Sequence, residues 1–373
     1  MMTELFEETI TTTSLDMRRL QRNQRRIARR KRTAIATAIG LVFFAVGGSV
    51  AWSMVKSFQA GETSVIADYP GAGQGAVQVV VNPGDSGADI AQTLFEAGVI
   101  ASPQAFIIEA RNNPDSARIV PGYYFMQREM KAEYALLALL DPGNRDLLTF
   151  TIPEGNVLSV YYQKIADLTD YTFEEVQAAA ADTDALGLPP EANGNLEGWL
   201  FPARYEFNPG THPTDILAEM VATTIRVLDQ RGVAPADRHR ILTIASLVEK
   251  EAKLNEDRPM IAGVIYNRLA IDQQLEFDST VKYLSPSEGV FTSSDERAID
   301  SPYNTYRNTG LPPGPIAGPG AASIEAAIDP AEHNFTFFVT VNLWTGETAY
   351  AENFLDHQKN VKILQAWYAE NEA

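Results

Sequence analysis

The hydrophobic pattern opens with one long uncharged run. Residues 33–55 contain no Asp, Glu, Lys or Arg, and residues 1–32 hold nine basic side chains against four acidic ones. A helix of that length crosses a hydrocarbon layer of about 30 Å, and basic residues before a span stay in the cytoplasm. The run is too long for the apolar segment of a cleaved signal peptide. We therefore predict a cytoplasmic basic tail (1–32), an uncleaved transmembrane anchor (33–55) and a flexible linker (56–76).

A short folded unit follows, over residues 77–146. Val77, Val79 and Val81 alternate as in a strand, and Ser86 is placed to cap an apolar helix. A second helix begins at Pro103, and extended structure returns at 122–125. This βααβ order resembles the LysM-like module of cell-wall proteins, which binds glycan. For Tyr123 and Tyr124 both core packing and sugar stacking stay open.

A larger unit is predicted over residues 147–365, before a short C-terminal tail (366–373). Residues 147–152 read as a strand, Thr172 and Glu175 form a capping box before a helix, and Pro213 precedes an amphipathic run. Mixed strands and helices in both units give the fold class α+β, a small LysM-like domain before a larger α+β domain.

The segment 238–252 carries the most informative helical pattern. Ile244, Ala245 and Val248 share one apolar face, and Glu249 and Glu251 lie on its two flanks. A carboxyl beside an apolar face can be desolvated enough to stay protonated near neutral pH, as a general acid requires. Helix geometry alone does not choose between the two glutamates, and both could be solvated surface charges.

Polar and aromatic residues then gather in the segments that follow. A helix over 259–269 carries Asn267 beside its apolar face, and a Gly/Pro-rich stretch from 301 to 320 contains Tyr303, Asn304 and Tyr306. Tyrosine rings stack on pyranose rings, and asparagine amides satisfy hydroxyl and N-acetyl groups. This stiffened segment therefore predicts the rim of a saccharide site.

Composition removes several other classes of function. The chain has 373 residues, no cysteine and a formal net charge of −18. Thiol chemistry is excluded, and a nucleic-acid partner is disfavoured because phosphate binding needs a positive field. The four histidines have no metal-ligand spacing and no Gly-rich phosphate loop is present, so we expect neither a metal nor a cofactor.

Several collinear motifs resemble the MltG family of endolytic murein transglycosylases. They are NLEGWLFPARYEF (195–207), LVEKEA (247–252), IAGVIYNRL (261–269), Asp278-x-Thr280-Val281, YNTY (303–306), GLPPGPIAGPG (310–320) and the closing Asn353 and His357. Two positions depart from the family pattern, with Glu276 in place of glutamine and Ser279 in place of proline. The loop conformation and any sugar contact at Glu276 are open for that reason.

The resemblance implies an activity and a set of site residues. Glu249 would be the catalytic residue in cleavage of MurNAc–GlcNAc β-1,4 bonds within nascent glycan strands, leaving 1,6-anhydroMurNAc ends. The enzyme would be a single-pass protein of the bacterial inner membrane with a periplasmic catalytic domain, working beside peptidoglycan synthases or the elongation or division machinery. The implied substrate-binding residues are Asn267, Asp278, Thr280, Tyr303, Asn304, Tyr306, Asn353 and His357. For His357, a structural role stays equally open.

Two alternatives remain at this point. One is an anchored glycan-binding or division scaffold without turnover. The other is a true hydrolase, which would need a second carboxylate. The acidic residues available for that role include Glu197, Glu206, Glu276 and Asp278.

Overall fold

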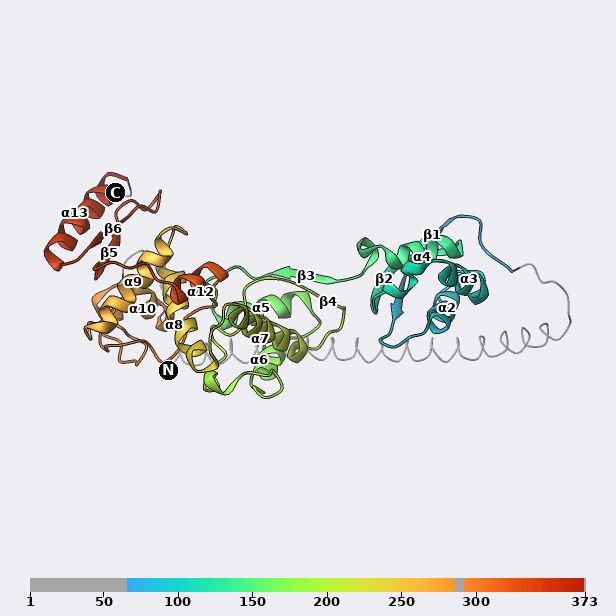
Figure 1. Ribbon diagram of the computed structural model, residues 1–373, viewed down its shortest axis with the longest axis horizontal. Coiled ribbons are helices and arrows are strands. Elements are labelled where there is room, and N and C mark those ends of the chain that lie inside the picture. The colour runs from blue at the N-terminus through green and yellow to red at the C-terminus, as the bar shows by residue number, and fades with distance from the viewer. Residues whose placement is uncertain (1–65, 286–291, 372–373) are drawn as a thin grey trace, which may run out of the picture. The chain divides into compact units, whose positions relative to one another are not determined.

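The computed structural model describes residues 66–285 and 292–371 (Figure 1). The expected basic tail, the anchor and residues 56–65 of the linker lie outside these ranges. Among the described residues no helix is both long and apolar enough to cross a membrane. Strands and helices mix throughout, which confirms the α+β class. The chain divides into two compact units, Met1–Asp146 and Leu147–Ala373, which are described separately.

The first unit is a two-stranded antiparallel sheet covered by helices. β1 and β2 pair from Ala72↔Met130 to Val81↔Gly122. A capping box between Ser86 and Asp89 starts the first helix, as its sequence predicts. The elements are β1 (Ala72–Val81), α2 (Gly87–Glu96), α3 (Pro103–Asn112), η1 (Pro114–Arg118), β2 (Gly122–Met130), α4 (Ala132–Leu140) and η2 (Pro142–Asn144).

Two details of this unit differ from expectation or settle an alternative. β1 starts at Ala72, inside the expected linker. Its pairing with β2 shifts register between Gln74 and Ala76, and Gly73 and Gly75 adopt the positive φ that lets the strand continue past this shift. Tyr124 is 1% exposed and its hydroxyl donates to the Val120 carbonyl, so it is a core residue. Tyr123 is half-buried.

Within the described residues, the second unit holds two small antiparallel sheets, nine α-helices and one 3-10 helix. α13 extends to Asn371, so residues 366–371, expected as a tail, are helical. The elements are β3 (Leu148–Thr151), α5 (Leu158–Leu168), α6 (Phe173–Ala180), η3 (Pro190–Ala192), β4 (Arg204–Phe207), α7 (Pro213–Gln230), α8 (Pro235–Glu251), α9 (Asp257–Ala270), α10 (Asp278–Leu284), α11 (Ser294–Arg297), α12 (Ala321–Ile328), β5 (Phe337–Thr340), β6 (Thr348–Ala351) and α13 (Phe354–Asn371). β3 pairs with β4, and β5 pairs with β6.

Helix α8 is the centre of this unit and packs against α9 and α12 (Figure 1). The sequence predicts one apolar face, but the structure buries every residue from Leu242 to Val248. Two polar residues fit in this buried stretch because the Thr243 and Ser246 hydroxyls donate to carbonyls of the same helix. Ser246 Oγ also accepts from the Ile316 N–H, which fixes the Gly/Pro-rich segment against α8.

Helix α9 begins at Asp257, two residues before the predicted start at Pro259. Proline is tolerated here because it still lies in the first turn, where backbone N–H groups have no partner within the helix. Asp257 is buried and accepts from the Thr348 hydroxyl at 2.9 Å and the Tyr350 hydroxyl at 2.7 Å. These bonds join the start of α9 to β6.

Candidate active site

The Glu249 carboxyl lies in the last turn of α8 and accepts four hydrogen bonds. Its Oε2 accepts from Arg258 Nη1 at 2.9 Å, from the Ser323 hydroxyl at 2.7 Å and from the Gly320 N–H at 3.0 Å. Its Oε1 accepts only from Arg258 Nη2, at 3.2 Å. The two oxygens are therefore unequal, with Oε2 fully bonded and Oε1 held by one longer contact.

The ends of two helices, α9 and α12, supply these donors. Arg258 stands in the first turn of α9, Ser323 lies in α12, and Gly320 precedes α12. The side chains of Glu249 and Arg258 are 7% and 10% exposed, so the ion pair is nearly buried. The Gly320 N–H lies at the N-terminus of α12 and has no partner within that helix. The helix dipole also favours negative charge at this end. All four contacts favour a charged Glu249.

A second glutamate lies beside this group. Glu154 Oε2 is 4.0 Å from Arg258 Nη2. Glycine at position 320 leaves room for Glu154, because a Cβ there would overlap the Glu154 carboxylate. Gly155, next in the chain, lies against Glu249 with φ +76°, and a Cβ there would be 3.6 Å from Glu249 Cγ.

The Gly/Pro-rich segment reaches the site through its backbone. The Gly155 N–H donates to the Gly318 carbonyl at 2.8 Å, and the Gly318 N–H donates to the Asn156 carbonyl at 2.9 Å. A Cβ at Gly318 would collide with the Tyr161 hydroxyl. Glycine here permits close approach of main chains, so the segment forms one wall of the site.

Glu251, the other flanking glutamate, faces a different element. Burial raises its pKa, with Ser279 of α10 opposing that shift by hydrogen bonding and the negative Asp278 adding to it. Glu251 therefore lies toward α10, and only Glu249 contacts Arg258, Ser323 and Gly320.

Asp278, Tyr306 and their neighbours form a cluster at the start of α10. Asp278 Oδ1 accepts from the Tyr306 hydroxyl at 2.7 Å and from the Thr292 hydroxyl at 2.5 Å. The Arg297 guanidinium lies 5.1 Å from the Tyr306 ring centroid. Burial and the bond to Asp278 raise the pKa of Tyr306. Both predicted residues are thus brought together, and both are half-buried.

Three other predicted residues have their polar groups turned into the protein. Thr280 is fully buried and bonds the Phe277 carbonyl and the Thr305 hydroxyl. The buried Asn304 amide donates to two backbone carbonyls, at 2.9 and 2.8 Å. Asn267 donates to the carbonyls of His333 and Phe335. In this structure these amides and hydroxyls position loops.

Asn353 and His357 lie at the start of α13. The Asn353 side chain accepts from the Asp356 N–H at 3.0 Å and donates to the Asp356 carboxylate at 2.9 Å, which is a helix-capping geometry. The His357 ring is 5.1 Å from the Phe337 ring, and burial, then the charge of Arg268, lower its pKa. His357 is therefore favoured in its neutral form.

The two departures from the family motif lie together before and within α10. Glu276 has φ +49°, its side chain is 46% exposed, and its Oε2 is 4.0 Å from Arg268 Nη1. Its backbone N–H donates to the Thr305 carbonyl at 3.1 Å. Ser279 starts α10 with Asp278 and faces Glu251.

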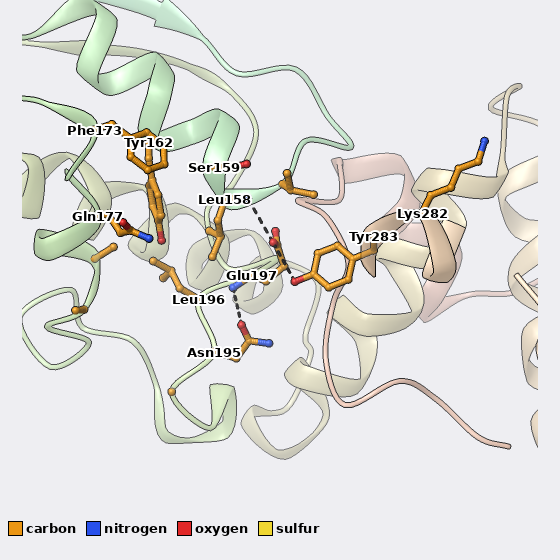
Figure 2. Close-up of a pocket in the computed structure, with 14 residues that line it drawn as sticks. Leu158, Ser159, Tyr162, Phe173, Gln177, Asn195, Leu196, Glu197, Lys282 and Tyr283 are labelled. Atoms are coloured by element: carbon orange, nitrogen blue, oxygen red, sulfur yellow. Dashed lines mark hydrogen bonds between the residues drawn. The ribbon is translucent and has the colours of Figure 1, made fainter. Parts of the chain in front are cut away.

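Tyr303 contacts Asn195 and Tyr283, two residues that line a separate cavity of about 640 Å³ (Figure 2). The Tyr303 hydroxyl accepts from Asn195, and its ring is 5.3 Å from the Tyr283 ring of α10. Glu197 lies in the cavity wall, 4% exposed, and Tyr283 points toward it in Figure 2. Glu197 Oε2 accepts from the Leu158 N–H at 3.3 Å and from Tyr283 at 3.4 Å, while Oε1 has no partner. Burial raises the pKa of Glu197 to about 7.

Among the residues that the structure describes, no group of three or more His, Asp or Glu side chains is placed to hold a metal ion. The four donors around the Glu249 carboxyl can support proton transfer and charge stabilisation there.

Comparison with known proteins gives the family. The sequence matches the profile described as the YceG-like family over residues 79–363. The chain belongs to this family. It is 33% identical over 320 residues to a protein named endolytic murein transglycosylase from Streptococcus pneumoniae, covering 76% of this chain and 58% of the relative. A protein of the same name from Bacillus subtilis is 32% identical over 302 residues, covering 76% of this chain and 83% of the relative.

A solved structure agrees with this placement. The crystal structure of a putative YceG-like protein from Listeria monocytogenes has 29% sequence identity and a TM-score of 0.51. The match covers 77% of this chain and 99% of that one. The chain thus spans somewhat more than half of the pneumococcal relatives' length and nearly all of the Listeria structure.

In this YceG-like chain the sequence motifs pointed to Glu249 but missed most of its partners. Arg258 stands nine residues further on, between two motifs, and Ser323 follows the last glycine of GLPPGPIAGPG. Glu154 follows the strand predicted over residues 147–152 and belongs to none of the motifs. An arginine in the first turn of a neighbouring helix was the one available signal for a charged partner.

Proposed function

We propose that this YceG-like chain is an endolytic peptidoglycan lytic transglycosylase with Glu249 as its single catalytic carboxyl. The names of its relatives support the reaction class, and the surroundings of Glu249 support the residue. The observation that carries the proposal is the inequality of the two oxygens, with three donors on Oε2 and one longer contact on Oε1.

This inequality suits a carboxyl that first donates and then accepts a proton. Oε1, with the weaker contact, would carry the proton and give it to the glycosidic oxygen as the C1–O4 bond breaks. The C6 hydroxyl of the same N-acetylmuramic acid would then attack C1, and the Glu249 carboxylate would take the hydroxyl proton. Arg258, Ser323 and the Gly320 N–H stabilise the carboxylate that exists between the two steps.

The intramolecular nucleophile explains why one carboxyl suffices. A hydroxyl already tethered to the reacting ring can have an advantage of about 7 to 11 kcal/mol over a free nucleophile. Digestion of purified sacculi in heavy-oxygen water is the direct test. We expect anhydro-terminated fragments without incorporated label, and none above background from Glu249→Gln.

True hydrolysis is the second candidate, and the position of Glu154 favours it. A hydrolase needs two carboxylates, and Glu154 is within 4.0 Å of the arginine that binds Glu249. Labelled reducing ends as the main product would establish this alternative. Unchanged glycan length with the wild-type chain would instead support a scaffold without turnover.

We propose further that residues 33–55 anchor the enzyme in the inner membrane, with residues 1–32 in the cytoplasm. The basic run before an uncharged span supports this orientation. The catalytic domain would then face the periplasm, beside peptidoglycan synthases or the elongation or division machinery. An alkaline phosphatase fused after Ala373 should be active, whereas a cytoplasmic C-terminus would leave it inactive.

The first unit would act as a LysM-like glycan-binding module. The order β1-α2-α3-β2 supports this, and Tyr123 is the half-buried aromatic side chain offered for stacking. Tyr123→Ala in the full chain carrying Glu249→Gln should weaken retention on sacculi. Unchanged retention would leave the module without this role.

A further inference from the structure

Glu154 and Glu249 both lie near the same guanidinium nitrogen of Arg258. Arg258 Nη2 donates to Glu249 Oε1 at 3.2 Å and lies 4.0 Å from Glu154 Oε2. A movement of the guanidinium by roughly one ångström would carry this nitrogen from hydrogen-bond distance of one carboxylate to that of the other. The other nitrogen, Arg258 Nη1, donates to Glu249 Oε2 and to the Ser323 hydroxyl.

The turn that carries Glu154 is held by its backbone. Gly155 donates its N–H to the Gly318 carbonyl at 2.8 Å and accepts from Lys250 Nζ at 3.1 Å. The Asn156 amide donates to the Pro153 carbonyl at 2.8 Å, and the Asn156 carbonyl accepts from the Gly318 N–H. A glutamate on a turn bonded at so many points has a defined direction, although its side chain is 46% exposed.

The Glu154 carboxylate lies against Gly320, which has no side chain. A Cβ at Gly320 would overlap Glu154 Oε1, so any other residue there would displace it. Gly320 is also the residue whose N–H binds Glu249. One glycine thus serves both carboxylates, through its N–H for Glu249 and through its missing side chain for Glu154.

We propose that Glu154 is a positioning residue for the reaction assigned above, acting through Arg258. It draws Nη2 away from Glu249 Oε1 and leaves that oxygen free to carry the proton that goes to the glycosidic oxygen. This inference rests on the proposed function and adds a second acidic residue to it, one that acts only through Arg258.

The charges around Glu249 fix the direction of the effect. Arg258 of α9 and Lys250 of α8 favour its carboxylate, whereas Glu154 opposes it. Tyr161 of α5 also lies near, and its pKa is raised by burial first, then by Tyr205 and three carboxylates including Glu154 and Glu249, so it stays neutral. Removing the Glu154 charge should therefore leave Arg258 Nη2 on Glu249 Oε1, and the loss of cleavage activity should begin at lower pH.

The test is the pH profile of glycan cleavage by the full chain with Glu154→Gln. The alkaline limb of the profile, where activity falls as pH rises, should shift to lower pH by about 0.5 to 1 unit. The rate near pH 8 should then be three- to tenfold lower, with little change on the acid side. Glu256→Gln, which removes an exposed charge two residues before Arg258, is the matched control and should leave the profile in place. A merely structural Glu154 would lower the unfolding temperature without moving the limb.

Two further variants keep the result interpretable. Gly320→Ala should displace Glu154 and shift the limb in the same direction, yet add little when Glu154 is already glutamine. Glu154→Asp keeps the charge and should restore part of the wild-type profile. Full additivity of Gly320→Ala and Glu154→Gln would show that they act independently and would overturn the proposal.

Failure of this inference can be told from failure of the proposed function. If wild type gives anhydro ends and the limb stays in place in Glu154→Gln, only the role of Glu154 is wrong. If reducing ends carry heavy oxygen and Glu154→Gln loses as much activity as Glu249→Gln, Glu154 acts on water and both proposals fall.

Discussion

Two glutamates of the second unit, Glu249 and Glu197, are both nearly buried, in opposite electrostatic surroundings. Glu249 accepts four hydrogen bonds, two of them from a guanidinium. Glu197 accepts two long ones, at 3.3 and 3.4 Å, and its Oε1 has no partner. Burial disfavours the charged form of either side chain, and only the hydrogen-bond donors differ.

The comparison shows what burial alone can and cannot do. At Glu197 desolvation dominates, and burial raises the pKa to about 7. At Glu249 four donors face the carboxyl, and the proposed mechanism uses them to hold a carboxylate between two proton transfers. A reactive acid that must regain its proton needs such donors, whereas a buried carboxyl without them is a neutral group over most of the acid range.

Glu249→Gln tests the reactive half of this comparison and has the largest expected effect. The amide keeps the shape but cannot donate a proton as an acid, so turnover should fall by about two to four orders of magnitude. Release of anhydro-terminated fragments is the measurement. Glu251→Gln, on the other flank of α8, should be much milder. Near-wild-type turnover in a folded Glu249→Gln protein would remove Glu249 from the mechanism.

Arg258→Met tests whether the guanidinium causes the electrostatic difference between Glu249 and Glu197. Removing one partner of a buried ion pair leaves an uncompensated charge and destabilises by about 3 to 5 kcal/mol. Denaturant unfolding near pH 7 should show this loss in the free energy of unfolding. In a Glu249→Gln background the same substitution should have a clearly smaller effect. Equal losses in both backgrounds would mean that Glu249 and Arg258 are not coupled.

Local signals predicted much of this fold. The capping boxes at Ser86 and Thr172 and the proline at the first position of α7 start helices where the pattern places them. Such signals depend on neighbours a few residues apart, which a sequence shows directly. The burial of every residue from Leu242 to Val248 in α8 was missed, because contacts on the remaining faces of this stretch come from α9 and α12.

The site was predictable only where its chemistry lies in a contiguous motif. LVEKEA places Glu249 on a helix flank, but Ser323 lies 74 residues away and reaches it only through the packing of α12. Thr280 and Asn304 match motif positions, yet both are buried and bond to backbone groups. A motif position therefore does not tell a substrate contact from a loop-positioning residue.

Glu197→Gln tests the neutral half of the comparison through stability. A folded-state pKa raised from 4.5 to about 7 means that the stabilising effect of the neutral carboxyl is complete below pH 4.5 and lost as pH rises through 7. The full loss corresponds to about 3 kcal/mol. Wild type should thus lose stability relative to Glu197→Gln between pH 4.5 and 8 in thermal unfolding. Glu206→Gln, at an exposed glutamate, should run parallel to wild type.

Tyr283→Phe has the smallest expected effect and isolates one donor at Glu197. The Tyr283 hydroxyl donates to Oε2 at 3.4 Å, and this bond lowers the pKa that burial raises. Removing it should move the midpoint of the pH-dependent stability loss upward, by less than about half a pH unit because the bond is long. The measurement is the wild-type pH–stability curve repeated on the variant. A downward shift would mean that Tyr283 keeps the carboxyl neutral, and hydrogen-bond donors could not then account for the difference between the two glutamates.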